Sequence, residues 1–238
     1  MNRRLVWLHS CGSTNDEAVA RLDDPTVWAV GADVQTAGRG RLGRSWWSAE
    51  TVGLYLSWIA RPRFPQSLGA ALPLLTAVAV ADELAAMGVS PMLKWPNDVQ
   101  VGGRKLAGIL CEARGTPDRW CAVVGLGLNL RCPSAGWPPE VPAVALEELD
   151  VAAPSAHAFA ERLLPRLERL LDRIPGEGLA PIISAWQRHG PPPGTRLRRG
   201  DIEGRYLGLA EDGALRIETP TGVHLIHTGD VELVSQKD

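Results

Sequence analysis

Residues 38–48 combine the side chains best suited to hold an anion that carries a flat or apolar body. The segment reads Gly-Arg-Gly-Arg-Leu-Gly-Arg-Ser-Trp-Trp-Ser. Glycine lets the backbone approach a ligand closely, and arginine supplies a permanent, forked positive charge that matches phosphate or carboxylate. Tryptophan adds an apolar wall with one N–H donor. We therefore interpret this glycine–arginine loop as a cover for an anionic ligand.

The glycine–arginine loop has two other interpretations. Such segments also form solvated loops or bind nucleic acid non-specifically. Gly38, Gly40 and Gly43 fit the pattern G-x-G-x-x-G, but a dinucleotide site would need a helix to open there and an acidic residue about 20 positions further on. The strand-like run 53–59 follows instead, and Arg63 stands where the acid is needed. A Rossmann site is therefore not favoured.

A second polar group precedes the loop in the chain. Ser13, Thr14 and Asn15 stand before the apolar-periodic residues 18–22, where they can cap a helix or face a polar ligand. Gln35 ends a strand predicted over residues 27–35 and leads into the loop. Sites often lie at strand ends in sheets with helices around them.

Two lysines stand in otherwise apolar segments. Lys94 and Lys105 are expected near the ends of neighbouring strands. A lysine is costly to bury without an anionic partner, so the pair indicates a site for an anion. The alternative is that both extend from a sheet edge into water.

Length and composition set limits on the function. A chain of 238 residues can hold one or two domains, and its formal net charge of −2 gives no general attraction to nucleic acid or membrane. The four cysteines form no C-x-x-C pair, which gives no sign of zinc or thioredoxin-like chemistry. No apolar leader is present, and the longest apolar stretch, 68–81, is broken by Pro73. We expect a reduced, cytoplasmic protein.

Hydrophobic periodicity and turn residues predict an α+β chain of two domains. Proline-rich residues 191–194 mark the boundary, so we place one domain over 1–190 and a second over 191–238, whose short alternating strands indicate a small β-barrel. Gly102-Gly103 predicts a hairpin turn. The expected strands are 4–9, 27–35, 51–61, 93–101 with a break at Pro96, 104–112 and 120–130; the expected helices are 68–87, 155–173 and 179–189, with a helical turn over 143–149.

Five motifs, in order over residues 1–130, resemble the biotin–protein ligases. They are Ser13-Thr14-Asn15, Gln35-Thr36-Ala37-Gly38-Arg39-Gly40-Arg41 through Trp47, Lys94-Trp95-Pro96-Asn97-Asp98, Arg104-Lys105-Leu106-Ala107-Gly108-Ile109-Leu110, and Gly125-Leu126-Gly127-Leu128-Asn129. The resemblance implies a mixed β-sheet flanked by helices, related to lipoate ligases, with a C-terminal SH3-like domain. It also implies a ligase that forms biotinyl-5′-AMP from biotin and ATP. That ligase then passes biotin to a lysine of a biotin carboxyl carrier protein of acetyl-CoA carboxylase.

The resemblance also implies roles for single residues. Ser13, Thr14, Asn15 and Gln35 would hydrogen-bond the ureido ring of biotin. Lys105, Arg41 and Asp98 would be the catalytic residues, with Lys105 on the activated carboxylate and α-phosphate and Asp98 orienting the incoming amine. The backbone of residues 39–41, including Gly40, would cover the biotin tail and the phosphate, and Arg39 and Arg41 would supply positive charge there. Trp46 would pack against biotin. Lys94 would be a second phosphate contact, and Asn129 would help hold the triphosphate or its metal. The remaining binding residues are Gly38, Arg44, Asn97 and Gly108, and Trp137 is a candidate to stack on adenine.

Further expectations concern cofactors and partners. Use of ATP implies Mg²⁺, with no metal site of the protein's own. Leu42 replaces a basic residue of some members, which lowers the charge of the loop. Members that repress transcription carry an N-terminal helix-turn-helix domain; this chain begins at the catalytic strand, so we expect no DNA binding. The sequence does not decide whether two copies pair through a sheet edge to form a homodimer. Two alternative functions also remain: a lipoate or octanoate ligase, and an RNA-binding module.

Overall fold

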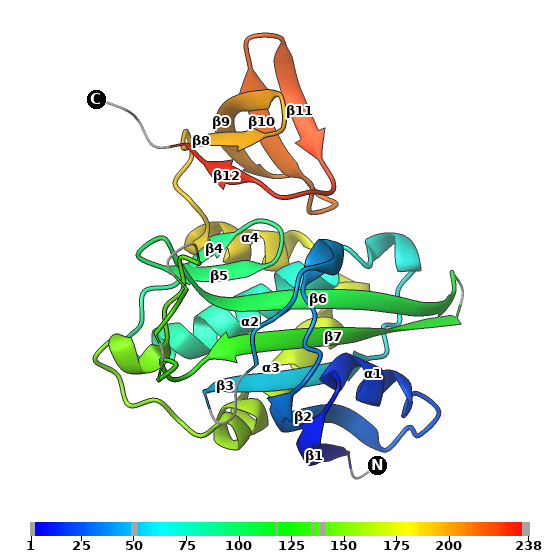
Figure 1. Cartoon of the computed structure of the whole chain (residues 1–238). Coiled ribbons are helices and arrows are strands. Elements are labelled where there is room, and N and C mark those ends of the chain that lie inside the picture. The colour runs from blue at the N-terminus through cyan, green and yellow to red at the C-terminus, as the bar shows by residue number, and fades with distance from the viewer. Residues whose placement is uncertain (1–2, 49–51, 118, 135, 139–140, 235–238) are drawn as a thin grey trace.

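The computed structural model describes residues 3–48, 52–117, 119–134, 136–138 and 141–234. Its larger part is built on a seven-stranded mixed sheet with the order β1-β2-β3-β7-β6-β5-β4 (Figure 1). Strands β1 and β2 are parallel, and the other neighbours are antiparallel. The strands are β1 (Arg4–Cys11), β2 (Val27–Gln35), β3 (Gly53–Ala60), β4 (Met92–Lys94), β5 (Asp98–Val101), β6 (Arg104–Thr116) and β7 (Arg119–Asn129).

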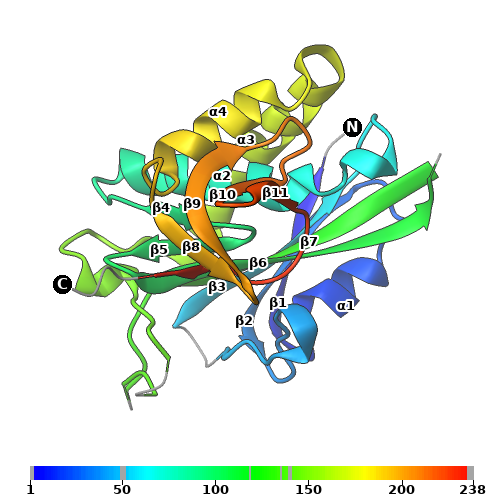
Figure 2. The same ribbon diagram turned by 90° about the horizontal axis from the view of Figure 1, so that it is seen from above.

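Three longer helices cover one face of this sheet, and the short α1 lies on the other (Figure 2). They are α2 (Ala71–Ala86), α3 (Ala156–Glu177) and α4 (Ala180–His189), whereas α1 spans Thr14–Val19. Helix α2 is apolar on nearly all sides and is buried between the sheet and the other helices, as expected for a core helix. Short 3₁₀ turns are η1 (Arg41–Gly43), η2 (Gln66–Leu68) and η3 (Leu146–Glu148).

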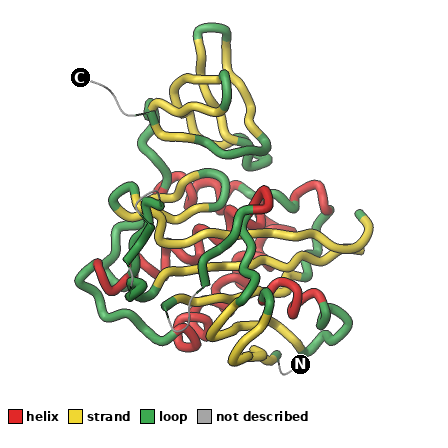
Figure 3. Tube along the Cα trace, in the orientation of Figure 1, coloured by secondary structure: helices red, strands yellow, loops and turns green. Residues whose placement is uncertain are grey.

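A second, smaller sheet follows α4 and stands above the first (Figure 3). It is antiparallel, with the order β11-β10-β9-β8-β12. The Trp95 indole donates to Gly213 O over 3.1 Å, so the two parts are in direct contact. The strands are β8 (Arg196–Arg199), β9 (Ile202–Leu209), β10 (Leu215–Thr219), β11 (Gly222–Ile226) and β12 (Glu232–Leu233).

The predicted fold class is confirmed: a mixed sheet flanked by helices and a small C-terminal β-sheet. The hairpin turn at Gly102-Gly103 is also confirmed, since both residues have positive φ. The predicted strand 93–101 divides into β4 and β5, as its proline indicated, and the helix expected over 68–87 begins only at Ala71. Residue 51 of the strand expected over 51–61 lies outside the described residues. The domain boundary at 190/191 stays a prediction.

One local expectation was wrong, and one alternative is now narrowed. Ser13 stands at the N-cap of α1, but its side chain makes no capping hydrogen bond. Lys94 and Lys105 do not lie on neighbouring strands, because β5 lies between β4 and β6. Both lysines still reach one cavity, since β4 and β5 are short and turn sharply at residues 95–97. Within the described residues no helix is long and apolar enough to cross a membrane.

One carboxylate on α3 ties this helix to the sheet. Glu168 Oε1 accepts the indole N–H of Trp28 over 2.9 Å and that of Trp58 over 3.0 Å, and Arg3 pairs with the other oxygen. Trp58 is fully buried. Each indole N–H therefore depends on this acceptor, because a buried donor without a partner keeps its desolvation cost.

We expect Glu168→Ala to lower the free energy of unfolding by about 2–4 kcal/mol, since it leaves two indole donors without an acceptor. Urea denaturation would measure the change. Glu161→Ala is the matched control on the same helix, because its side chain is 64% exposed, and it should change stability by less than about 0.5 kcal/mol. Equal stability of the two variants would contradict the assigned role of Glu168.

Candidate functional site

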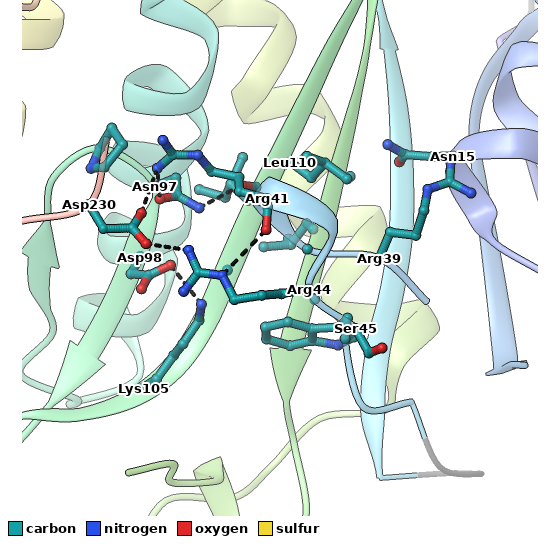
Figure 4. Close-up of a pocket in the computed structure, with 18 of the residues that line it drawn as sticks. Asn15, Arg39, Arg41, Arg44, Ser45, Asn97, Asp98, Lys105, Leu110 and Asp230 are labelled. Carbon is teal, nitrogen blue, oxygen red and sulfur yellow. Dashed lines mark hydrogen bonds and ion pairs between the residues drawn. The ribbon is translucent and has the colours of Figure 1, made fainter. Parts of the chain in front are cut away.

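A cavity of about 170 Å³ lies on the α1 side of the larger sheet, beneath the glycine–arginine loop (Figure 4). Its walls come from segments far apart in the chain: α1 with its N-cap, the end of β2, the loop, the β4–β5 connection, β6, β7 and the turn before β12. The lining residues are Ser13, Thr14, Asn15, Gln35, Arg39, Gly40, Arg41, Arg44, Ser45, Trp46, Lys94, Trp95, Pro96, Asn97, Asp98, Lys105, Gly108, Ile109, Leu110, Gly125, Leu126, Gly127, Asp230 and Val231.

One end of the cavity is lined by buried polar side chains that carry no charge. Ser13, Thr14 and Asn15 are each 3% exposed, although all three carry polar side chains. The Thr14 N–H donates to Gln35 Oε1 over 2.8 Å, and Gln35 Nε2 donates to Ser48 Oγ over 3.0 Å. Buried polar groups held in this way are fixed in orientation. This end can therefore present set donors and acceptors to a polar ring.

The floor in the middle of the cavity is backbone without side chains. A Cβ atom at Gly127 would lie 2.2 Å from the Trp46 indole, and one at Gly108 would lie 2.9 Å from the same ring. A Cβ at Gly125 would lie 2.4 Å from Asn15 Oδ1. These glycines let Trp46 and Asn15 lie directly on β6 and β7. The Trp46 Nε1 is buried and has no hydrogen-bond partner among the described residues.

The other end of the cavity is cationic. Lys105 Nζ lies 2.8 Å from Asp98 Oδ1 and 5.3 Å from the centre of a Trp46 ring. Arg41 donates to Asn97 Oδ1 over 2.8 Å, and Asn97 Nδ2 in turn donates to Ile109 O over 2.9 Å. Lys94 lines the same end. Such positioned cations can offset negative charge on phosphate or carboxylate oxygens.

The C-terminal sheet contributes an acid to this end. Asp230 pairs with Arg44, and its Oδ1 lies 3.4 Å from an Arg41 nitrogen. Arg41 also donates to Gly229 O over 3.4 Å. In Figure 4 both arginines extend toward Asp230. The turn before β12 therefore holds the glycine–arginine loop in place and completes the wall of the cavity.

Arg39 lies at the polar end, although we expected it above a phosphate beside Arg41. Its two terminal nitrogens bond both carboxylate oxygens of Asp16 at 2.6 Å, and one lies 3.8 Å from Glu112 Oε2. Figure 4 shows Arg39 directed toward Asn15 and away from Arg41. The hydrogen bonds from Arg39 lower the pKa of Asp16 below its ordinary value of 3.8, so this clasp between loop and α1 is charged at neutral pH.

Of the predicted site residues, Gly38 and Asn129 are not among those lining the cavity. Gly38 O accepts the Trp46 N–H over 2.9 Å and so shapes the loop. Asn129 Nδ2 donates to Lys105 O and Val144 O over 3.3 and 3.1 Å, which braces the strand that carries Lys105. Any role of Asn129 toward a triphosphate stays a prediction. So does the stacking role of Trp137, whose indole donates to Glu148.

Sequence reasoning missed Asp16, Ser57, Glu112 and Asp230. Ser57 is a polar residue inside an apolar run, which is a weak signal for a site, and Glu112 ends the predicted strand 104–112. Asp230 stands in a Gly-Asp turn like many others, so no signal marked it. Gly125 and Gly127 were noted in a motif, but their role as a floor follows only from the pairing of β6 with β7.

Comparison with known proteins gives one consistent result. The model of the biotin/lipoate A/B protein ligase family matches residues 13–129, and that of the biotin protein ligase C-terminal domain matches residues 195–234. The bifunctional ligase/repressor BirA of Bacillus spizizenii is 34% identical over 98% of this chain and 75% of its own length. The biotin–(acetyl-CoA-carboxylase) ligase of Paracoccus denitrificans is 33% identical over 92% of this chain and 96% of its own length.

A solved structure agrees with these sequence relatives. The biotin protein ligase of Aquifex aeolicus in complex with biotin and ATP superposes with a TM-score of 0.80 and 27% identity. The match covers 97% of this chain and 98% of that one, so it includes both sheets.

We expect Asp16→Asn to loosen the glycine–arginine loop, because Asn keeps the shape of Asp16 but loses the charge that Arg39 pairs with. Limited digestion with trypsin, followed by mass spectrometry, should show cleavage within the loop rising about two- to five-fold, the range expected for a partly exposed ion pair. In the wild type the lowered pKa of Asp16 means that the clasp contributes above about pH 4 and is lost as pH falls through that lowered value.

Asp201→Asn, in an exposed turn of the C-terminal sheet, is the control and should leave loop cleavage unchanged. Equal cleavage of the Asp16→Asn variant and the wild type would show that the clasp does not hold the loop.

Proposed function

This chain belongs to the biotin/lipoate A/B protein ligase family, and from that premise we propose that it attaches biotin to a carrier protein in an ATP-dependent reaction. The biotin–(acetyl-CoA-carboxylase) ligase of Paracoccus denitrificans matches nearly end to end. The Aquifex aeolicus ligase, solved with biotin and ATP, supports both substrates.

One observation carries the proposal: a single cavity joins an end with buried, uncharged hydrogen-bonding groups, where the one arginine is paired with Asp16, to a cationic end across a glycine floor. Biotin has the matching order of groups, with a cyclic urea at one end, an apolar chain and a carboxylate at the other. Thr14 and Gln35 would meet the urea, Trp46 would cover the chain, and Lys105 would meet the carboxylate. Long acids with an apolar head would leave the buried polar end unmatched.

In the first step a carboxylate oxygen of biotin attacks the α-phosphorus of ATP. The bond from this phosphorus to the bridging oxygen breaks, pyrophosphate leaves with the electron pair, and biotinyl-5′-AMP remains. Negative charge grows on the α-phosphate oxygens during this exchange. Lys105 and Arg41 stand at that end of the cavity and would stabilise the charge, while Arg44 and Lys94 would hold the remaining phosphates.

In the second step the ε-amine of a carrier lysine attacks the carbonyl carbon of the anhydride. The bond from carbon to the phosphate oxygen breaks, AMP leaves with the electron pair, and a proton passes from the nitrogen to the departing phosphate as the amide forms. An ionised Asp98 can only accept hydrogen bonds, so beside Lys105 it would orient the incoming amine. The glycine–arginine loop and Trp46 cover the cavity and would keep water from the anhydride.

Mg²⁺ would enter with ATP, because Mg²⁺ is usually bound through substrate phosphates with one or two carboxylates. The described residues include no cluster of three or more His, Cys, Asp or Glu side chains that could form a separate metal site. When bound, the ion would neutralise phosphate charge. A carboxyl carrier domain as partner, the absence of DNA binding and a homodimer stay predictions.

We expect pyrophosphate release from ATP with biotin, and not with lipoate or octanoate. Mass spectrometry of the bound product should give the mass of biotinyl-AMP. Release with lipoate or octanoate would leave the family assignment intact but would show that biotin is not the substrate that defines this enzyme. If a folded sample with Mg²⁺ released pyrophosphate with none of the three acids, the ligase proposal would fail, and salt-dependent retention of RNA would then be the next test.

We expect Lys105→Met to lower the rate of pyrophosphate release by about 100- to 1,000-fold, the usual effect of removing one group that stabilises transition-state charge. Methionine keeps most of the side-chain volume, so the fold should persist. Arg169→Gln, an exposed position on α3, removes one positive charge far from the cavity and is the control. A Lys105→Met enzyme with the wild-type rate would remove Lys105 from the mechanism.

A further inference from the structure

A carboxylate stands among the cations at the phosphate end of the cavity. Four basic side chains line that end, and Asp98 and Asp230 are the acids among the described residues that line the cavity. Asp98 lies 2.8 Å from Lys105 and already has a place in the proposed second step. Asp230 has none, although an acid beside a site for phosphates opposes their binding.

Asp230 spans two arginines of the glycine–arginine loop. Its Oδ2 pairs with Arg44, and its Oδ1 lies 3.4 Å from an Arg41 nitrogen (Figure 4). Carboxylate and phosphate oxygens make the same kind of charge-assisted hydrogen bond with guanidinium groups. Asp230 therefore takes up the donors that the proposed function assigns to the phosphates of ATP.

The C-terminal sheet fixes the position of this carboxylate. Asp230 follows Gly229, whose φ of 105° suits glycine and would strain another residue. Val231, next in the chain, is 3% exposed and belongs to the hydrophobic core, and β12 then pairs with β8. The carboxylate is thus brought to the loop by a turn that is held on the side of β12.

The ion pairs of Asp230 can be broken at moderate cost. The side chain of Asp230 is 44% exposed and that of Arg44 is 60% exposed. Ion pairs this open to water change an equilibrium constant by up to about five-fold. Arg41 also keeps a second acceptor, Asn97 Oδ1, at 2.8 Å. Both arginines can therefore exchange Asp230 for another anion.

A nucleotide phosphate and Asp230 compete for the same place. Both are anions, and an ionised carboxylate can only accept hydrogen bonds. Like charges a few ångström apart repel each other, the more so where water is partly excluded. A phosphate that approaches Arg41 and Arg44 therefore has to drive Asp230 away from them.

We propose that Asp230 holds the place of a nucleotide phosphate on Arg41 and Arg44 while the cavity is empty, and that nucleotide binding displaces it. The proposal rests on the function proposed above, in which the phosphates of ATP lie at this end. Displacement weakens the hold of the C-terminal sheet on the loop, so occupancy of the phosphate site is coupled to the contact between the two parts of the chain. When pyrophosphate leaves, Asp230 returns to the arginines and opposes rebinding.

The test is Asp230→Asn, which keeps the shape of the side chain and removes its charge. Calorimetry with α,β-methylene-ATP, an analogue that cannot release pyrophosphate, should show binding about three- to ten-fold tighter than to the wild type, because two exposed ion pairs no longer oppose the phosphates. Biotin alone should bind with nearly unchanged affinity, because Lys105, which would meet its carboxylate, pairs with Asp98. Asp201→Asn makes the same charge change outside the lining of the cavity and should leave nucleotide affinity unchanged.

A double-mutant cycle links the effect to the arginine pair. Arg44→Gln removes both a partner of Asp230 and a phosphate contact, so this variant should bind the analogue more weakly. Asp230→Asn should then tighten binding by a smaller factor in the Arg44→Gln background than in the wild type, because only Arg41 remains to be freed. Equal factors in the two backgrounds would show that Asp230 acts only through its general charge, which would overturn the proposal.

Thermal unfolding of each variant checks that it is folded. A folded Asp230→Asn protein that binds the analogue as weakly as the wild type, or more weakly, would also overturn the proposal. If the loss occurred only with Mg²⁺ present, Asp230 would be a partner of the metal; if it occurred without Mg²⁺ as well, Asp230 would only hold the arginines in place. A wild-type protein that binds no nucleotide would instead contradict the proposed function, so the two failures can be told apart.

Discussion

The contact between the Trp46 indole and the bare backbone of β6 and β7 is the constraint on which the cavity depends. Gly108 and Gly127 leave no side chain where the ring lies, and a Cβ atom at Gly127 would overlap it at 2.2 Å. Because the indole lies directly against these glycines, the glycine–arginine loop crosses the sheet close to its surface. The polar groups at one end and the cations at the other then border the same narrow space, as a reaction between two bound substrates requires.

Charge balance explains how a loop with three arginines stays in place. Each arginine meets an acceptor on a different part of the chain: Arg39 pairs with Asp16 on α1, Arg44 with Asp230 before β12, and Arg41 with Asn97 between β4 and β5. The positive charge of the loop is therefore met by acceptors close to it. It adds no general positive charge to the chain, whose formal net charge is −2. An anionic substrate would meet cations that these contacts already direct toward the cavity.

The predictions that succeeded share a physical basis. Residues 27–35 and 104–112 are apolar or β-branched runs bounded by turn residues, and such runs form strands because their side chains pack on a pleated surface. The glycine–arginine loop combined residue types whose chemistry is independent of the surrounding fold. The partner of Arg39 could not be predicted in this way, because Arg39 and Asp16 meet only when α1 packs beside the loop, and its role toward a phosphate stays a prediction.

The sequence by itself determined the two-part α+β fold, the family, and most of the residues that line the cavity, since local periodicity and short motifs encode them. Only the tertiary structure decided which partners these residues have. Asp230 reaches Arg44 across 186 positions, and Glu112 reaches Asn15 across 97. Such contacts depend on strand order and on how the second sheet sits above the first, and no local pattern records either.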